Sequence, residues 1–293
     1  MAVNTYQLIT DEIIKKLEQG KIPWKRSFNG VELPPRNFKS KKMYKGINLL
    51  MLGMSGYKSP YWLTFNQAKD MGGQVTKGSK ATRILFAKMM SYKDKDDKDQ
   101  MRPIYKYSSV FNLDVIEGID CPISNLEPEE QREVQYIENC EAVLSIMKEK
   151  NKIPPIEYHD LFRAYYSPGE DIIRTCEIKD YISDEEYYST LFHEIIHSTG
   201  HNSRLKRDMT GGKQSKSYAK EELIAEIGSC FICGMTGIKT AIIDNATAYI
   251  QSWLGALRND PTLIVQAASR AQKAVEYLSI QVTDEETQEE DES

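Results

Sequence analysis

The sequence predicts an α+β protein of two domains, a small N-terminal α+β domain over residues 1–127 and a mostly helical C-terminal domain over residues 128–282. Three observations predict this fold class. The length of 293 residues corresponds to about two domains. Helical and strand periodicities both recur along the chain. The charge changes sign, because residues 1–127 hold 21 Lys and Arg against 13 Asp and Glu and the rest hold 17 against 30.

In the N-terminal domain the first expected element is a helix over 5–19, where Leu8, Ile9, Ile13 and Leu17 form one apolar stripe and Gly20 ends it. Two short helices are expected within 47–56 and 64–73, each ended by glycine. Alternating patterns at 82–92 and 101–113 predict two strands of a hairpin.

In the C-terminal domain we expect a helix over 129–150 and a small antiparallel sheet that includes a hairpin of 161–166 with 171–178. Further helices are expected near 184–199, 217–235, 241–258 and 261–279. The tail at 283–293 is acidic and has no apolar residue to bury, so it is expected to be disordered.

Composition and apolar runs indicate where in the cell the protein is expected to be found. The chain has no apolar run long enough to span a membrane, so we expect no membrane partner. The first twenty residues lack the pattern of a secretory signal. Five irregularly spaced cysteines favour a reducing compartment, and we therefore expect a cytoplasmic location. The net charge of −5 would argue against nucleic acid only if it were spread evenly, which it is not.

The most specific motif is H-E-x-x-H at His193, Glu194 and His197. On a helix, histidines four residues apart project from one face and suit two ligands of one Zn²⁺. The intervening glutamate can accept a proton from a water that the metal activates. The spacing therefore predicts a zinc site with Glu194 as general base in hydrolysis of a peptide bond.

A third protein ligand is expected on the predicted helix that carries Glu222 and Glu226, again four residues apart. We predict Glu222 as the ligand and Glu226 as the residue that orients a ligand histidine, as in the gluzincin arrangement that this pattern resembles. Glu221 and His201 are the competing assignments for the third ligand. Tyr218, with His201 as second choice, is the candidate for oxyanion support.

Two other segments of this domain suggest roles near the metal. The strand at 171–178 could offer an edge to an extended peptide substrate. The segment 204–217, between the two metal helices, could act as a mobile cover. Cys230 and Cys233 fall inside an apolar helix and are interpreted as buried thiols.

Basic and aromatic residues alternate between residues 21 and 83, a mixture typical of surfaces that bind single-stranded nucleic acid. The run also includes Phe38, Lys39, Lys41, Tyr61 and Phe65, and its aromatic residues could equally form a core. The predicted DNA-binding residues are Trp24, Lys25, Arg26, Arg36, Lys42, Tyr44, Lys45, Tyr57, Trp62, Lys77 and Lys80.

Segments at 44–52, 56–84 and 110–118 resemble the N-terminal domain of ArdC-type antirestriction proteins, and similar domains occur in plasmid primase-like proteins. The segments 187–208 and 218–232 resemble the zincin-like metallopeptidase domain that follows it in that family. The resemblance covers about residues 4–275. It implies a protein of a mobile element or phage that binds single-stranded DNA and protects incoming DNA from restriction. Its metal residues correspond to His193, His197 and Glu222, and its base to Glu194.

Two functions follow as hypotheses, and a further possibility is that the N-terminal domain binds protein rather than DNA. In the first, a zinc metallopeptidase bound to single-stranded DNA cuts an unidentified protein, for example a host restriction component. In the second, the protein masks DNA, and its metal site is structural or not needed for protection. The presence of Glu194 favours the enzyme, because a purely structural site does not need it.

Overall fold

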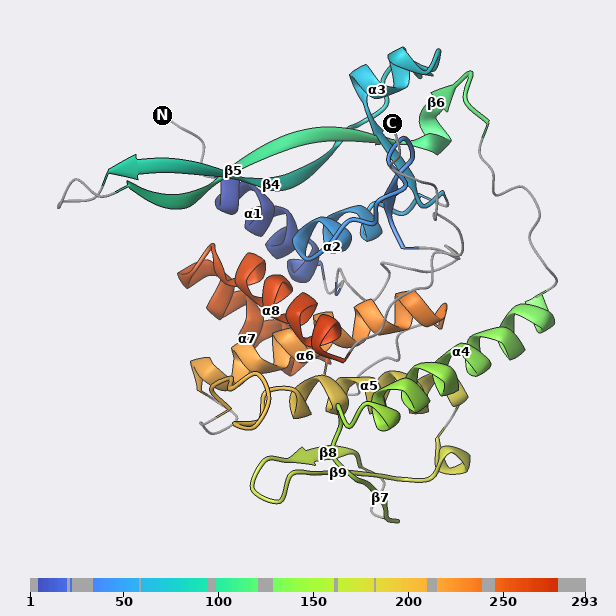
Figure 1. Cartoon of the computed structure of the whole chain (residues 1–293), viewed down its shortest axis with the longest axis vertical. Coiled ribbons are helices and arrows are strands. Elements are labelled where there is room, and N and C mark those ends of the chain that lie inside the picture. Colours follow the sequence, from blue (N-terminus) through green and yellow to red (C-terminus); the bar gives the residue numbers. More distant parts are fainter. Residues whose placement is uncertain are drawn as a thin grey trace, which may run out of the picture.

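The computed structural model describes residues 5–19, 22, 34–57, 59–93, 99–120, 129–160, 163–181, 183–209, 215–238 and 246–278. Within this part of the chain, helices and sheets stack in layers from the β4–β5 hairpin, through the helices, to a small sheet (Figure 1). Among the described residues, no helix is long and apolar enough to cross a membrane. The predicted boundary at residue 127 and the tail at 283–293 lie outside the described residues.

The N-terminal half builds a four-stranded sheet in the order β1-β2-β5-β4. The β1–β2 pair is parallel, and the β2–β5 and β4–β5 pairs are antiparallel. The predicted hairpin is confirmed, and its register pairs Thr82 with Val110 and Lys93 with Asp99. The elements are α1 (Thr5–Glu18), β1 (Arg36–Asn37), α2 (Ile47–Gly53), β2 (Tyr61–Thr64), α3 (Phe65–Asp70), β3 (Gln74–Val75), β4 (Thr82–Lys93), β5 (Asp99–Asn112) and β6 (Ile116–Glu117).

The C-terminal half is mostly helical, as predicted. Its elements are α4 (Glu129–Glu149), β7 (Ile156–Tyr158), β8 (Tyr165–Ser167), β9 (Ile172–Thr175), α5 (Asp184–Ser198), α6 (Lys216–Thr236), α7 (Ala246–Asn259) and α8 (Leu263–Tyr277). The small sheet has the order β7-β9-β8. It is mixed rather than antiparallel, because β7 pairs with β9 in parallel while β8 pairs with β9 antiparallel.

The two halves share one hydrophobic core. Ile13 and Leu17 of α1 and Leu50 of α2 belong to the same buried cluster as residues of α5, α6, α7 and α8. Helix α1 packs on α7 and α2 packs on α8, between the β4–β5 hairpin and the C-terminal helices (Figure 1). Polar contacts follow the same seam, since the Thr10 hydroxyl donates to the Pro261 carbonyl at 2.6 Å. The N-terminal half is therefore packed against the C-terminal helices over an extended apolar contact.

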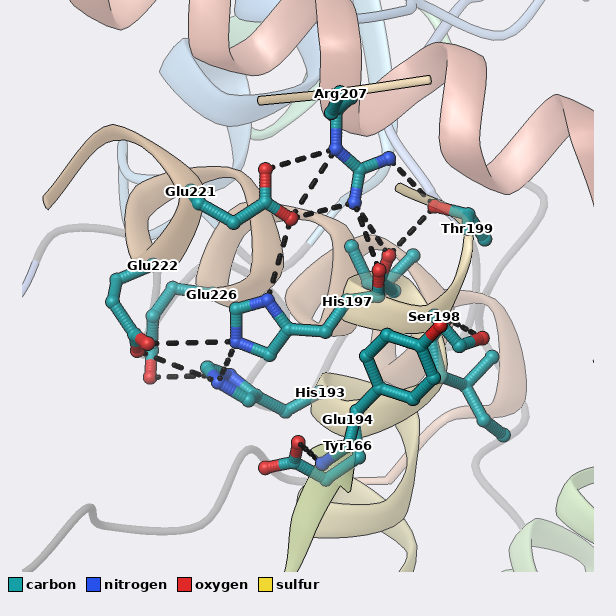
Figure 2. Close-up of polar contacts among 12 residues, drawn as sticks. Tyr166, His193, Glu194, His197, Ser198, Thr199, Arg207, Glu221, Glu222 and Glu226 are labelled. Carbon is teal, nitrogen blue, oxygen red and sulfur yellow. Dashed lines mark hydrogen bonds and ion pairs between the residues drawn. The ribbon is translucent and has the colours of Figure 1, made fainter. Parts of the chain in front are cut away.

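Helices α5 and α6 cross closely, and a glycine allows it. A Cβ at Gly228 of α6 would lie 2.8–3.0 Å from three side-chain carbons of Ile196 on α5, which is too close for any larger residue. Buried residues on both helices, including Leu191, Phe192 and Leu223, fill the contact. At this crossing His193 and His197 of α5 face Glu222 of α6 (Figure 2).

Candidate metal centre and nucleic-acid surface

Helix α5 presents the two motif histidines on one face. The Ser183 hydroxyl accepts a hydrogen bond from the Glu186 amide at 3.2 Å and caps the first turn of the helix. The apolar stripe of α5 is buried. The Nε2 atoms of His193 and His197 lie 3.1 Å apart. Two nitrogens on one tetrahedral ion at about 2.05 Å would lie roughly 3.3 Å apart, so the pair is already spaced for a metal.

Glu222 on α6 completes the cluster. One of its carboxylate oxygens lies 3.6 Å from His193 Nε2 and the other lies 3.6 Å from His197 Nε2. Within the described residues, His193, His197 and Glu222 are the group whose ligand atoms lie close enough to hold one ion. Figure 2 shows the three side chains pointing toward one another. Two imidazoles and a carboxylate are the donor set of many catalytic zinc sites, so the residues fit a divalent metal.

The cluster is charged in a way that favours a cation. Burial lowers the pKa of His193, but contact with Glu222 and the charges of Glu194 and Glu226 outweigh it and raise this pKa to about 9. Burial raises the pKa of Glu222, but contacts with both histidines and a hydrogen bond from Tyr218 lower it to about 2. The carboxylates therefore hold positive charge on the imidazoles where a metal ion would otherwise supply it.

The second nitrogen of each histidine meets a different glutamate. His193 Nδ1 lies 3.5 Å from Glu226 Oε1, in the position predicted for an orienting carboxylate. His197 Nδ1 lies 3.3 Å from Glu221 Oε1. Glu221 was the competing candidate for the third ligand, but its carboxylate lies on the far side of the His197 ring from Glu222 (Figure 2). Three carboxylates of α6 thus surround the two imidazoles.

Glu194 lies beside this cluster and is held by the small sheet. Its Oε2 accepts a hydrogen bond of 2.8 Å from the amide of Tyr166 in β8. Its charge contributes to the raised pKa values of His193 and His197, so it lies near both. The prediction that strand 171–178 is the edge strand is wrong, because β9 is central and β8 lies at the edge next to α5. The sequence contained no signal that separated these two strands.

The other two candidates near the site differ in position. Tyr218 lies one turn before Glu222 on α6, and its side chain is close enough to the Glu222 carboxylate to help lower the pKa of that group. His201 lies beyond α5, where its Nδ1 contacts the Ser203 hydroxyl at 2.7 Å. Its charge partner is Asp171 at 3.8 Å, away from the three-residue cluster. The oxyanion role of Tyr218 stays a prediction.

The described part of the segment after α5 is held to the end of the helix by hydrogen bonds. Residues 199–207 fold back on the helix end, with the Arg207 amide donating to the Gly200 carbonyl at 2.9 Å. The Arg204 guanidinium donates to the Ser198 carbonyl and pairs with Asp171. Residues 204–207 are therefore held to the helix end, while 210–214 lie outside the described residues, and the role of the segment as a mobile cover stays a prediction. Cys230 and Cys233 are buried thiols, as predicted.

The predicted DNA-binding residues divide by exposure. Trp24, Lys25 and Arg26 lie outside the described residues. Trp62 is 1% exposed and packs with Leu52 and Val110, so its prediction as a base-stacking residue is wrong in this fold. Arg36 is also buried, at 8% exposed, and its guanidinium donates to the Pro34 carbonyl. An alternation of basic and aromatic residues does not reveal which aromatic residues face inward.

The remaining residues lie at or near the surface. Tyr44 and Tyr57 are half-buried, and Tyr57 packs edge-on against Trp62. Lys45 is exposed but forms a salt bridge of 2.9 Å with Glu276 of α8. Lys42, Lys77 and Lys80 are exposed, in accordance with a surface role.

Two further aromatic features lie in this half, and both involve residues of the basic-aromatic run that are not among the predicted DNA-binding residues. Phe65, at the start of α3, is 56% exposed and packs edge-on against Phe111. The Lys41 ammonium lies 3.9 Å from the centre of the Phe38 ring, which forms a cation–π pair. A phenylalanine at the first turn of an exposed helix was the available signal for Phe65.

Known proteins match both halves of the chain. The family described as the N-terminal domain of anti-restriction factor ArdC matches residues 3–111, and a zincin-like metallopeptidase family matches residues 141–270. Two DNA primases TraC of Escherichia coli are 32% and 31% identical over 93% of this chain, but the chain spans only 20% and 27% of their lengths. Protein y4eC of Sinorhizobium fredii (strain NBRC 101917 / NGR234) is 30% identical over 95% of this chain and 92% of its own.

Solved structures agree with these matches. Crystal structures of the antirestriction protein ArdC from plasmid R388, metal-free and Mn(II)-bound, are each 35% identical to this chain with a TM-score of 0.76. The match to the metal-free structure covers 94% of this chain and 97% of the ArdC chain. The match to the Mn(II)-bound structure covers 97% of this chain and 100% of the ArdC chain. This protein therefore belongs to the ArdC family of antirestriction proteins, with a zincin-like metallopeptidase domain behind the ArdC N-terminal domain.

Proposed function

We propose that this protein binds single-stranded DNA through its N-terminal half and hydrolyses a peptide bond at the metal centre, and that it thereby protects incoming DNA from restriction. The observation that carries the enzymatic part is the position of Glu194. Its carboxylate lies beside two imidazoles and a carboxylate that fit one divalent ion, and it is oriented by the Tyr166 amide. A metal site with only a structural role would not need this carboxylate.

His193, His197 and Glu222 would hold the ion, which we propose to be Zn²⁺. Such an ion lowers the pKa of a bound water to about 7 and polarises a carbonyl group. Glu194 accepts the proton of the attacking water and passes it to the leaving amine. Tyr218, whose hydroxyl is already beside Glu222, donates a hydrogen bond to the oxygen that becomes negative.

The substrate is proposed to approach along β8. This strand is at the edge of its sheet and contacts α5, and its Tyr166 amide reaches Glu194. An extended peptide can add to such an edge by main-chain hydrogen bonds. We propose a protein substrate of the host, such as a restriction component, because a peptidase that serves antirestriction has to act on the proteins that restrict DNA.

The DNA partner is proposed for the exposed part of the basic half. Lys42, Lys77 and Lys80 are exposed cations that can neutralise phosphates, and Tyr44 and Tyr57 are partly exposed rings. Trp24, Lys25 and Arg26 remain part of this proposal. The similar ArdC structures are of a protein from plasmid R388, which supports a role on a mobile element.

The test separates proteolysis from DNA masking. Glu194→Gln keeps the size of the side chain and leaves the proposed ligands in place, so we expect unchanged metal content and loss of protection in a plasmid-transfer assay with a restricting recipient. Glu185→Gln, on the same helix about two and a half turns earlier, is the matched control and is expected to protect fully. Full protection by Glu194→Gln with the metal still bound would contradict the enzymatic proposal and favour DNA masking.

A further inference from the structure

Arg207 is buried at the end of α5 although it follows the helix by nine residues. Three backbone hydrogen bonds fold residues 199–207 back on themselves, from Leu205 to Thr199, from Lys206 to His201 and from Arg207 to Gly200. Lys206 adopts a left-handed backbone conformation, with φ of 52°, which closes this turn. The turn returns the Arg207 guanidinium to the helix end, where its side chain is 7% exposed.

The guanidinium binds the helix end and one glutamate at once. Its Nη2 donates to the Ile196 carbonyl at 2.7 Å and its Nη1 donates to the Thr199 hydroxyl at 2.7 Å. Its Nε and Nη2 donate to the Glu221 carboxylate at 2.9 and 2.7 Å (Figure 2). A Cβ at Gly200 would lie 3.0 Å from Arg207 Nη2, so the glycine leaves room for this arrangement. The planar fork of arginine suits a carboxylate held at two points.

Glu221 passes this restraint to the metal centre. Its Oε1, which accepts from Arg207, also lies 3.3 Å from His197 Nδ1. A hydrogen bond at Nδ1 leaves Nε2 free as a metal ligand and fixes the plane of the ring. Glu221 also stands next to Glu222 in the sequence. The contacts with Arg207 and His197 hold its carboxylate outside the cluster of His193, His197 and Glu222.

We propose that Arg207 is a positioning residue for the metal centre, which holds Glu221 on His197 Nδ1 and so keeps Glu221 out of the coordination sphere. This inference rests on the metal site of the proposed function, and it explains why Glu222 rather than Glu221 is the ligand.

The test compares Arg207→Gln with Arg204→Gln in the full chain. Arg204 is a matched control because it lies in the same turn, is 9% exposed, pairs with a carboxylate and donates to a carbonyl at the end of α5. The dissociation constant for Zn²⁺ is measured by competition with a chromogenic chelator. Removal of an outer partner of a metal-bound histidine weakens binding about 10–100-fold, which we expect for Arg207→Gln. For Arg204→Gln we expect a change of less than about threefold.

A second measurement reports the ligand set itself. The absorption spectrum of the Co²⁺-loaded protein depends on the number and type of ligands, and a variant that is only less stable would keep the wild-type spectrum. We expect Arg207→Gln to change the spectrum and the double variant Arg207→Gln/Glu221→Gln to restore it. Arg207→Lys, which keeps a cation without the fork, is the variant to use if Arg207→Gln does not fold, and its expected affinity is intermediate.

The outcomes separate this inference from the proposed function. If the wild-type protein binds no metal at His193 and His197, the proposed function fails. If it binds metal but Arg207→Gln and Arg207→Lys bind Zn²⁺ as tightly and give the same Co²⁺ spectrum, only the positioning role of Arg207 is overturned.

Discussion

The metal centre and the basic surface use charge in opposite ways. At the metal centre the three glutamates of α6 are buried and each contacts a basic side chain: Glu221 contacts Arg207, Glu222 contacts both histidines, and Glu226 contacts His193. On the N-terminal half, Lys42, Lys77 and Lys80 are exposed to solvent. Buried contacts are little affected by salt, whereas exposed charges are strongly screened.

This difference teaches what to expect from substitutions. A buried site whose members restrain one another fails as a unit when one member is lost, because the partners are left unsatisfied. A surface of separate cations loses affinity in small, nearly equal steps. The predictions that follow test this contrast, beginning with the largest expected effect.

Loss of one ligand histidine is expected to have the largest effect. His197→Ala removes one of the two imidazoles and leaves Glu221 and Glu222 without their shared partner. We expect the protein to retain no stoichiometric metal after dialysis, as measured by elemental analysis of the purified variant. His201→Ala is the control, because His201 lies outside the three-residue cluster, and full metal content is expected. Equal metal loss in both variants would show that the cluster is not the binding site.

The next largest effect is expected from a residue that sequence reasoning assigned to DNA. Trp62 is 1% exposed, so Trp62→Ala should leave a cavity and lower the free energy of unfolding by about 3–5 kcal/mol. Chemical denaturation followed by circular dichroism measures this. A decrease in the free energy of unfolding of less than about 1 kcal/mol would mean that the ring is not in the core. Trp62 would then again be a candidate for DNA binding.

The pH dependence of metal binding follows from the raised pKa of His193. Metal binding needs the neutral imidazole, so below pH 9 a proton must be displaced. We expect the affinity for Zn²⁺ to rise roughly tenfold per pH unit from pH 7 to 9 and then to level off. In the metal-free protein the protonated ring stabilises the fold, fully below about pH 6.5, and this stabilisation is lost as the pH rises through about 9. Measurements of Zn²⁺ affinity and of stability across this pH range, at fixed ionic strength, test the two expectations. A Zn²⁺ affinity that does not change between pH 7 and 9 would contradict the raised pKa of His193.

An exposed aromatic residue should affect DNA without affecting the fold. Phe65 is 56% exposed, so Phe65→Ala is expected to leave stability nearly unchanged and to weaken binding of a labelled oligonucleotide by about 1 kcal/mol, or roughly fivefold. Tyr158→Ala, at a ring that is 54% exposed in the other half, is the control with no expected effect on DNA affinity. Equal effects of the two variants would show that Phe65 does not contact DNA.

The smallest effects are expected at single lysines and appear in the salt dependence. Lys77→Gln and Lys80→Gln should each lower the slope of log affinity against log salt by about 1. Lys148→Gln and Lys150→Gln, exposed lysines of the other half, should leave the slope unchanged. Binding that does not depend on salt in the wild-type protein would contradict the nucleic-acid proposal itself.

Sequence reasoning reached the metal cluster because helical spacing fixes geometry locally. His193 and His197 four apart on a capped helix could only face the same way. Glu222 and Glu226 followed from the same spacing on a second helix, and both lie against the histidines. The order of helices and the β4–β5 hairpin were likewise readable, because each depends on local periodicity and turn residues.

The features that could not be predicted from the sequence depend on contacts between segments that are distant along the chain. Whether Trp62 faces DNA or the core is decided by Leu52 and Val110, which lie on other elements. The role of Glu221 depends on Arg207, which reaches it only because residues 199–207 fold back. The edge position of β8 depends on strand order, which short strands do not encode locally.

The most direct test of the central claim is anomalous diffraction at the zinc absorption edge from crystals of the metal-loaded protein. We expect one strong peak, from a zinc ion at about 2.0–2.2 Å from His193 Nε2, His197 Nε2 and a carboxylate oxygen of Glu222. We expect the Glu221 carboxylate to remain in contact with His197 Nδ1. A peak bound by Glu221 or His201, or no peak between α5 and α6, would contradict the central claim.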